Sequence, residues 1–306
     1  MECRYGSSAR VKKIQVFLYL LSFTLVLCPV AFASSNNVSA IRFVFTIEKF
    51  YDDKFKSPTA VHVDKKNKEL YVADGGNNEI FIFDTRGTPI FRIGASKGIV
   101  SPFAIAVKGD RIYLSEEGKN YIDILSYRGE AIREMKPGDM PFLPGRISID
   151  DEGKAYVINK AATNCMIFDK DDKFMGYLGI RFESLTDVAV SKDRVYLLTP
   201  HNNHAVQVYD RSGKYMWSFE ALEGLGGTLG LPIAAKVDKY GLLWVLDAIN
   251  GIVVFNENGK AVSRLGDYGY GRGQIFFPVD IDIDDEDMLY IVEKEAKRIS
   301  VFKVER

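Results

Sequence analysis

Hydrophobic and polar positions alternate in short runs along this chain, and one pattern of such runs recurs six times. In each copy the first run alternates apolar residues with small or polar ones, as in residues 61–63, 105–107 and 281–283. The centres of these runs are 41 to 47 residues apart, at Val61, Ile105, Ile147, Val188, Ala235 and Ile281. A period of two predicts β-strands with one apolar face, and a repeat of this length indicates a propeller.

Two further features recur at fixed places in the copies. The second predicted strand carries one large aromatic residue, namely Tyr71, Tyr113, Tyr156, Tyr196, Trp244 or Tyr290. The third strand mostly ends in a four-residue turn that closes with glycine, as in residues 84–87, 210–213 and 256–259. Such turns predict a hairpin into a fourth strand. Each copy is therefore expected to form a four-stranded blade.

The sixth copy lacks its fourth strand, because the chain ends at Arg306 soon after the third one. Residues 41–47 alternate in the same way and belong to no other copy. We expect this N-terminal segment to complete the last blade and close the ring, which removes exposed sheet edges. The predicted fold is an all-β, six-bladed β-propeller in one domain, residues 34–306.

The repeat resembles the NHL family. Residues 70–80 (LYVADGGNNEI) are similar to that family's consensus, and residues 269–278 (GYGRGQIFFP) are similar to its Gly-rich connection between blades. The resemblance implies a six-bladed propeller used mainly as a binding platform. It also implies an alternative, because a minority of six-bladed relatives are metal-dependent lyases, lactonases or other hydrolases.

The first 33 residues have the pattern of a secretory signal. Arg10, Lys12 and Lys13 precede an apolar run over residues 14–30, and the sequence Ala-Phe-Ala follows at 31–33. This pattern predicts cleavage before Ser34 and a periplasmic or secreted protein without a membrane span, with an uncleaved N-terminal anchor as the alternative. The predicted mature chain keeps one cysteine, Cys165, so it cannot form an internal disulfide.

Charge excludes one class of partner. The chain has a net charge of −1, and no block of five or more Lys and Arg occurs in it. Nucleic-acid binding needs a concentrated basic patch. We therefore expect a protein, peptide or glycan partner in the cell envelope and no nucleic acid.

Two rings of positions are expected around the axis at one rim of the propeller. In the first ring Arg146, Asp187 and Asp280 stand where other blades have alanine, so they are candidate ligand contacts or members of a charge network. In the second ring the acidic residues are Asp74, Glu116, Asp247 and Glu293. Oxygen ligands suit Ca²⁺, but an Asp at a strand end can equally accept backbone hydrogen bonds from the following turn.

The histidines give a weaker metal signal. His201 and His204 flank a loop of the fourth copy and could contribute to Zn²⁺ binding, which usually needs a third ligand. His62, the third histidine, shares its strand position with Lys236 and Asp282 of neighbouring copies. We expect these three residues to form a polar cluster near the axis, in which Asp282 compensates the lysine.

Tyr268, Tyr270 and Arg272 lie in a long loop between copies and are residue types enriched at interfaces. The favoured function at this point is an exported binding scaffold that uses its rim and loops, without a catalytic residue and without a cofactor. The alternative is a divalent-metal-dependent lyase or lactonase-like hydrolase at the channel mouth, with Ca²⁺ or Zn²⁺. No Gly-x-Ser-x-Gly motif or dinucleotide fingerprint supports another enzyme class.

Overall fold

The structure is a computed structural model that describes residues 1–2, 38–179, 181–202 and 204–306. The predicted signal at residues 1–33 falls almost wholly outside the described residues. Residues Ser35–Arg306 form one compact unit. Within the described part of the chain, no helix is both long enough and apolar enough to cross a membrane.

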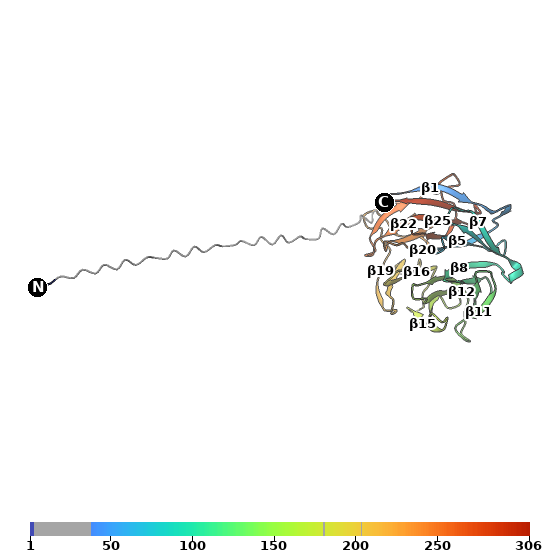
Figure 1. Cartoon of the computed structure of the whole chain (residues 1–306), viewed down its shortest axis with the longest axis horizontal. Helices are drawn as coiled ribbons and strands as arrows, with labels where there is room; N and C mark the ends of the chain where they lie inside the picture. Colours follow the sequence, from blue (N-terminus) through green and yellow to red (C-terminus); the bar gives the residue numbers. More distant parts are fainter. Residues whose placement is uncertain (3–37, 180, 203) are drawn as a thin grey trace. The chain divides into compact units, whose positions relative to one another are not determined.

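Six four-stranded antiparallel sheets make up this unit, and each sheet is one blade (Figure 1). Blade 1 contains β4 (Pro58–Asp64), β5 (Glu69–Asp74), β6 (Glu79–Asp84) and β7 (Pro89–Ile93). Blade 2 contains β8 (Pro102–Lys108), β9 (Arg111–Glu116), β10 (Ile122–Ser126) and β11 (Ala131–Met135). Blade 3 contains β12 (Pro144–Ile149), β13 (Ala155–Asn159), β14 (Asn164–Phe168) and β15 (Phe174–Leu178).

The other three blades repeat this order. Blade 4 contains β16 (Asp187–Val190), β17 (Arg194–Leu198), β18 (Val206–Asp210) and β19 (Tyr215–Phe219). Blade 5 contains β20 (Pro232–Val237), β21 (Leu243–Asp247), β22 (Gly251–Phe255) and β23 (Ala261–Leu265). Blade 6 contains β24 (Pro278–Ile283), β25 (Met288–Glu293), β26 (Arg298–Glu305) and the N-terminal strand β1 (Ala40–Ile47). A short hairpin, β2 (Lys49–Phe50) and β3 (Asp53–Lys54), leads from β1 into blade 1.

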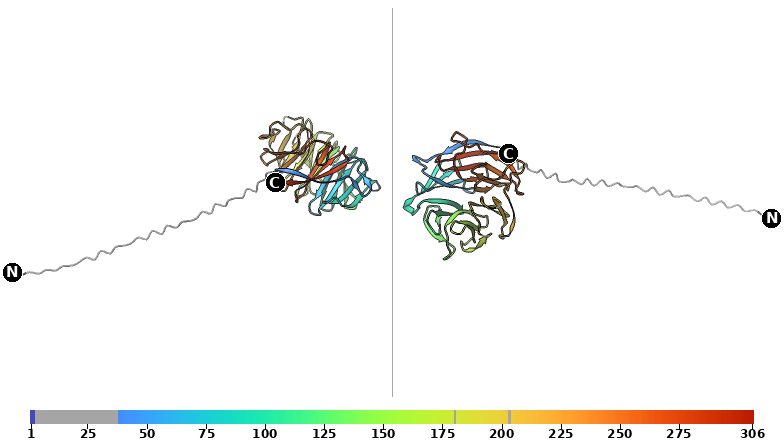
Figure 2. Two further views of the ribbon diagram at one scale, coloured as in Figure 1. Left: turned by 90° about the horizontal axis from the view of Figure 1, so that it is seen from above. Right: turned by 180° about the vertical axis from the view of Figure 1, so that it is seen from behind.

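Ring closure by the N-terminal strand is confirmed. β1 pairs antiparallel with β26 from Ala40 opposite Glu305 to Ile47 opposite Ile299. Figure 2 shows the N-terminal strand beside the C-terminal one in both views. The exposed edge of β26 is thereby covered, so the predicted six-bladed propeller with a shared last blade is the observed fold.

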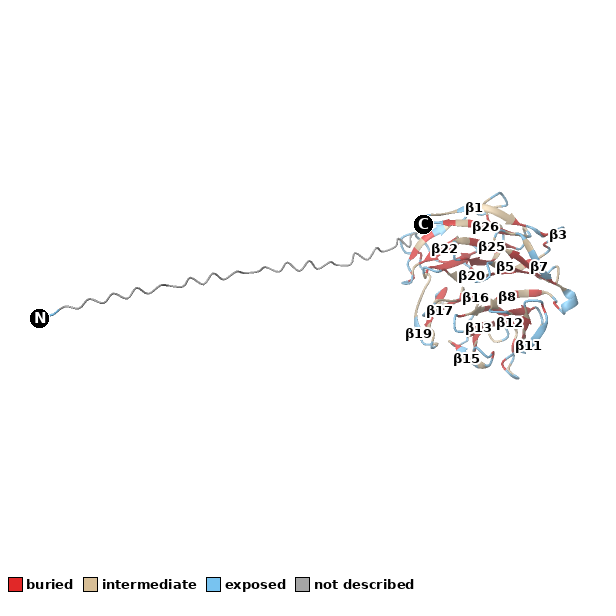
Figure 3. Ribbon diagram, viewed as in Figure 1, coloured by how far each residue is buried: buried red, intermediate tan, exposed pale blue. Residues whose placement is uncertain are grey.

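Apolar side chains from adjacent blades form the core between the sheets. The six aromatic residues of the second strands are all at most 4% exposed, and they pack against neighbouring blades. Burial decreases from the inner to the outer strand of each sheet. The inner strands are mostly buried, whereas outer strands such as β7 and β11 are largely exposed (Figure 3). The predicted turns also form, because Asp84 accepts hydrogen bonds from Arg86 and Thr88 while Gly87 adopts a φ of 86°.

The inner strands β4, β8, β12, β16, β20 and β24 surround the central axis in chain order. Each has a hydrogen-bonded neighbour within its sheet on one side only, so its other edge is free and faces the central axis. Side chains on these edges line the axial channel. The candidate site is therefore built from the six inner strands.

Candidate functional site

The acidic ring at the ends of the second strands holds the connections between blades. Asp74 is fully buried and accepts four backbone N–H hydrogen bonds of 2.8–3.1 Å, from Lys56, Ser57, Gly76 and Asn77. Asp247 accepts four equivalent hydrogen bonds of 2.8–3.0 Å, from Gly230, Leu231, Ile249 and Asn250. Each carboxylate thus ties the incoming linker to the outgoing turn.

Glu116 and Glu293 are used in a similar way. Glu116 accepts from the N–H of Val100 and pairs with Lys119. Glu293 accepts from the N–H of Phe276 at 2.7 Å and pairs with Arg298 at 2.9 Å. These carboxylates therefore accept hydrogen bonds from the backbone, as the alternative to a metal-binding ring predicted.

The residues present do not fit a divalent cation at this ring. The oxygens of Asp74 and Asp247 already accept N–H donors, and Glu116 and Glu293 already face cationic side chains. Across the described residues, no three His, Cys, Asp or Glu side chains come together as a group that could hold a metal ion. A metal ligand set needs several oxygen or nitrogen atoms free to converge on one point.

The three residues that break the alanine pattern form a buried charge network. Arg146 in blade 3 lies opposite Asp280 in blade 6, and its guanidinium is 2.7 Å from the Asp280 carboxylate. Arg146 also donates to the carbonyl of Val279. Arg146 is 9% exposed, and Asp187 and Asp280 are each 3% exposed. An ion pair therefore spans the axis at this level of the channel.

Each axial aspartate also joins its own inner strand to the next one. Asp280 accepts from the N–H of Val61 at 2.9 Å, and Asp187 accepts from the N–H of Ala235 at 2.8 Å. Asp282 does the same with Val63 at 3.0 Å. These N–H groups lie on strand edges that face no other sheet, and a buried donor without a partner would be costly.

Burial dominates the electrostatics of Asp187. It raises the pKa of this carboxyl to about 6, although Arg146 and Lys236 oppose the shift. Asp187 is held by Val188 and Ala235, and it is enclosed rather than open to the cavity described next.

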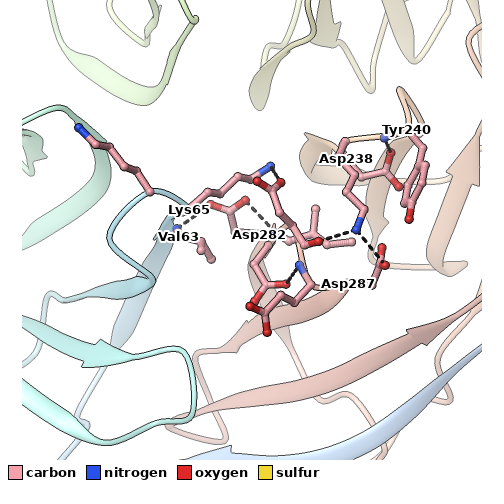
Figure 4. Close-up of polar contacts among 12 residues, drawn as sticks. Val63, Lys65, Asp238, Tyr240, Asp282 and Asp287 are labelled. Atoms are coloured by element: carbon pink, nitrogen blue, oxygen red, sulfur yellow. Dashed lines mark hydrogen bonds and ion pairs between the residues drawn. The ribbon is translucent and has the colours of Figure 1, made fainter.

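A cavity of about 530 Å³ opens at the opposite mouth of the channel, and all six inner strands contribute to its lining. Its polar lining includes His62, Lys236 and Asp282. These three residues stand two positions further along their strands than the Arg146 level, which places them about 7 Å nearer this mouth. Figure 4 shows Asp282 beside Val63 and Lys65 at this mouth, where Lys65 reaches Asp285 at 3.3 Å.

The predicted cluster of His62, Lys236 and Asp282 forms in part. The Nδ1 atom of His62 is 3.7 Å from Asp282 Oδ2, and it has no hydrogen-bond partner among the described residues. The Lys236 ammonium lies within the field of Asp282, yet it makes no ion pair within 4.0 Å to any carboxylate that the structure describes. Asp282 therefore lies near both the imidazole of His62 and the ammonium of Lys236 without a hydrogen bond to either.

Burial lowers the pKa of His62 below its ordinary 6.5, with Asp282 opposing the shift and Lys236 adding to it. The pKa of Lys236 is raised: burial acts against its charge, but the carboxylates of Asp282, Asp280 and Asp187 outweigh it. At neutral pH the cavity is therefore lined by a neutral imidazole and by an ammonium group. A neutral base and a cation that line one cavity are groups that general base catalysis can use.

The remaining candidates lie away from this cavity. His201 and His204 are exposed in the loop after β17 of blade 4, whereas His62 lies on the inner strand of blade 1, so no three-histidine site arises. Tyr268 and Tyr270 are exposed and pack against Phe276, while the Arg272 guanidinium lies 5.2 Å from the Phe43 ring centre.

The cavity itself was not predicted, because the strand pattern carries no signal for how far six inner strands stand apart.

Solved structures with the same architecture come from enzymes. A gluconolactonase from Xanthomonas campestris superposes with a TM-score of 0.66 at 14% identity, covering 88% of this chain and 97% of that one. A streptogramin B lyase gives 0.64 at 13% identity over 87% and 98% of the two chains. Virginiamycin B lyase from Staphylococcus aureus gives 0.60 at 16% identity over 81% and 95%. At these identities the likeness shows the fold alone.

No family model matches the chain, and no curated protein matches its sequence. Membership of the NHL family therefore stays a prediction. What is shown is a six-bladed propeller like those of the lactonase and lyase structures.

These similarities correct the expectation of a binding scaffold. The similar solved structures include gluconolactonases and streptogramin B lyases, which carry the names of enzymes and not of binding scaffolds. The sequence favours the scaffold because its repeat resembles a family of binding platforms and because it contains no local catalytic motif. An enzyme whose groups come from separate blades has no local motif to find.

Proposed function

We propose that this protein is a hydrolase or lyase that cleaves an ester or lactone bond of a small molecule in the axial cavity. The observation that carries the proposal is the convergence of His62, Asp282 and Lys236 on one cavity of about 530 Å³. This volume lies in the range of small-molecule sites. The enzyme names of the similar solved structures raise the expectation of this reaction class, as an analogy of fold.

In the proposed reaction His62 acts as the general base. Its lowered pKa keeps the imidazole neutral at pH 7, so it can take a proton from a water molecule or from a carbon next to the carbonyl. In hydrolysis the activated water adds to the carbonyl carbon, the ring oxygen leaves, and the proton on His62 passes to that oxygen. The product is a hydroxy acid, so atoms and protons balance.

Lys236 and Asp282 assist this base. The Lys236 ammonium stabilises the negative charge that develops on the carbonyl oxygen. Asp282 is a positioning residue, because backbone N–H groups of Val63 and Ile283 hold its carboxylate 3.7 Å from His62 Nδ1. Every proton transfer uses a side chain of this protein, and no step requires the acidic ring.

The test is turnover by the purified protein on aldonolactones and on cyclic peptide lactones, followed by titration of released acid. We expect kcat/KM to rise with pH through a midpoint below 6.5, as His62 loses its proton. H62Q and K236M should each lower kcat about 10²-fold or more. H204Q is the matched control, since His204 is exposed on another blade, and it should keep full activity. Absence of turnover across the panel, or full activity in H62Q, would refute the proposal.

We also propose export by the N-terminal signal and relatedness to NHL repeats. The basic residues before the apolar run at 14–30 support export. Fractionation of cells that express the full chain, with N-terminal sequencing, tests it: a mature end at Ser34 in the envelope supports the proposal, and a cytosolic full-length chain contradicts it.

A further inference from the structure

We infer that the axial cavity selects an anionic substrate, a small molecule that carries a carboxylate besides the bond to be cleaved. The inference rests on the proposed function and names its substrate class. It starts from the four lysines that line the cavity, Lys65, Lys66, Lys108 and Lys236.

Within the described part of the chain, three of these four ammonium groups have no carboxylate partner. Lys65 pairs with Asp285 at 3.3 Å. By contrast, Lys66, Lys108 and Lys236 have no carboxylate within 4.0 Å among the residues that the structure describes. Lys108 reaches only the backbone carbonyl of Asp151, at 3.1 Å. The cavity thus presents positive charge that the protein leaves uncompensated at close range.

Three acidic side chains line the cavity against four lysines, and two of the three, Asp64 and Asp282, already accept N–H donors. The third, Asp151, is exposed and makes no ion pair within 4.0 Å with any lysine that the structure describes. Asp282 accepts from Val63 and Ile283, and Asp64 accepts from the backbone of Lys66 and Asn67 and from the Asn67 amide. Asp282 raises the pKa of Lys236 and so keeps it charged, yet the structure describes no carboxylate within 4.0 Å of the ammonium. This leaves the ammonium groups available to an incoming anion.

The lysines lie at two depths. Lys236 is half-buried on the inner strand of blade 5, and it lines the same cavity as His62. Lys66 and Lys108 lie at the ends of the inner strands of blades 1 and 2, at the mouth. A substrate can therefore place its reacting carbonyl near Lys236 and a carboxylate near Lys66 and Lys108. Two lysines at a cavity mouth also attract anions from a distance and raise their local concentration.

The experiment compares two aryl esters, p-nitrophenyl acetate and mono-p-nitrophenyl succinate, which differ by a carboxymethyl group and therefore by one negative charge. K66Q/K108Q should lower kcat/KM for the succinate ester roughly tenfold, equivalent to about 1.4 kcal/mol, and leave the acetate unchanged because it carries no charge for the lysines to contact. K49Q/K260Q removes the same charge from exposed positions outside the cavity and should leave both esters unchanged.

Calorimetric binding of succinate separates the two proposals. Succinate binding that weakens in K66Q/K108Q and with added salt supports the anion site. This holds even if neither ester is turned over, because then only the proposed function fails. Turnover of both esters at equal kcat/KM, without succinate binding, overturns the anion site and leaves the proposed function standing. Equal loss on both esters in K66Q/K108Q also overturns it, because the lysines would then act on folding or on the reaction itself.

Discussion

Replacement of Arg146 by methionine tests the charge network across the axis. Arg146 and Asp280 join opposite blades, and their side chains are 10% and 5% exposed. At 2.7 Å and an effective dielectric constant of about 20, their attraction is about 6 kcal/mol before desolvation is counted. R146M keeps most of the side-chain volume but leaves Asp280 and Asp187 buried without this cation.

We expect R146M to lower the free energy of unfolding by about 3 kcal/mol or more, the cost of leaving one member of a buried pair alone. Urea unfolding followed by tryptophan fluorescence measures it. The double variant R146M/D280N should recover part of the loss, because it removes the orphaned charge. R42M is the matched control: Arg42 pairs with Glu305 at the surface, with side chains 63% and 47% exposed, and should cost less than about 1 kcal/mol. An R146M variant within 1 kcal/mol of the parent would refute the reasoning.

Three further predictions follow from the same contacts. Chelator treatment should leave the melting temperature unchanged, because backbone N–H groups and cationic side chains already contact the carboxylates of the acidic ring. D74A should lower the free energy of unfolding by about 2–4 kcal/mol, because it leaves four N–H donors unsatisfied. A chelator-sensitive melting temperature would contradict this. Asp187 has a pKa of about 6 in the folded state against an ordinary value of 3.8, so the folded state binds the extra proton between these values. The free energy of unfolding should therefore fall as pH rises from about 4 to 6. D187N should lose this pH dependence in a series of unfolding measurements, and an unchanged profile would count against the reasoning. Deletion of residues 38–47 should expose the edge of β26 and produce soluble aggregates on size-exclusion chromatography, and a monodisperse monomer would show that closure by β1 is dispensable.

The candidate site shows where sequence reasoning stops. The place of Arg146, Asp187 and Asp280 near the axis could be predicted, because they break a column of alanines. Their partners could not, since an ion pair between blades 3 and 6 joins residues 134 positions apart. The leading function was wrong for a related reason: enzyme motifs are local in sequence, and here the candidate groups come from three blades.

The sequence by itself determined the architecture of this protein. Strand alternation, the aromatic column, the turn glycines and the unpaired segment at residues 41–47 each act over a few residues, so a one-dimensional pattern carries them. Only the tertiary structure decided which polar groups hold the ring together and which face an open cavity. Asp74 and Asp247 accept hydrogen bonds from backbone N–H groups. Among the residues that the structure describes, His62 and Lys236 have nitrogen atoms with no carboxylate within hydrogen-bonding range. The physical reason is that a side chain's availability depends on every donor and acceptor around it, and those neighbours come from other blades.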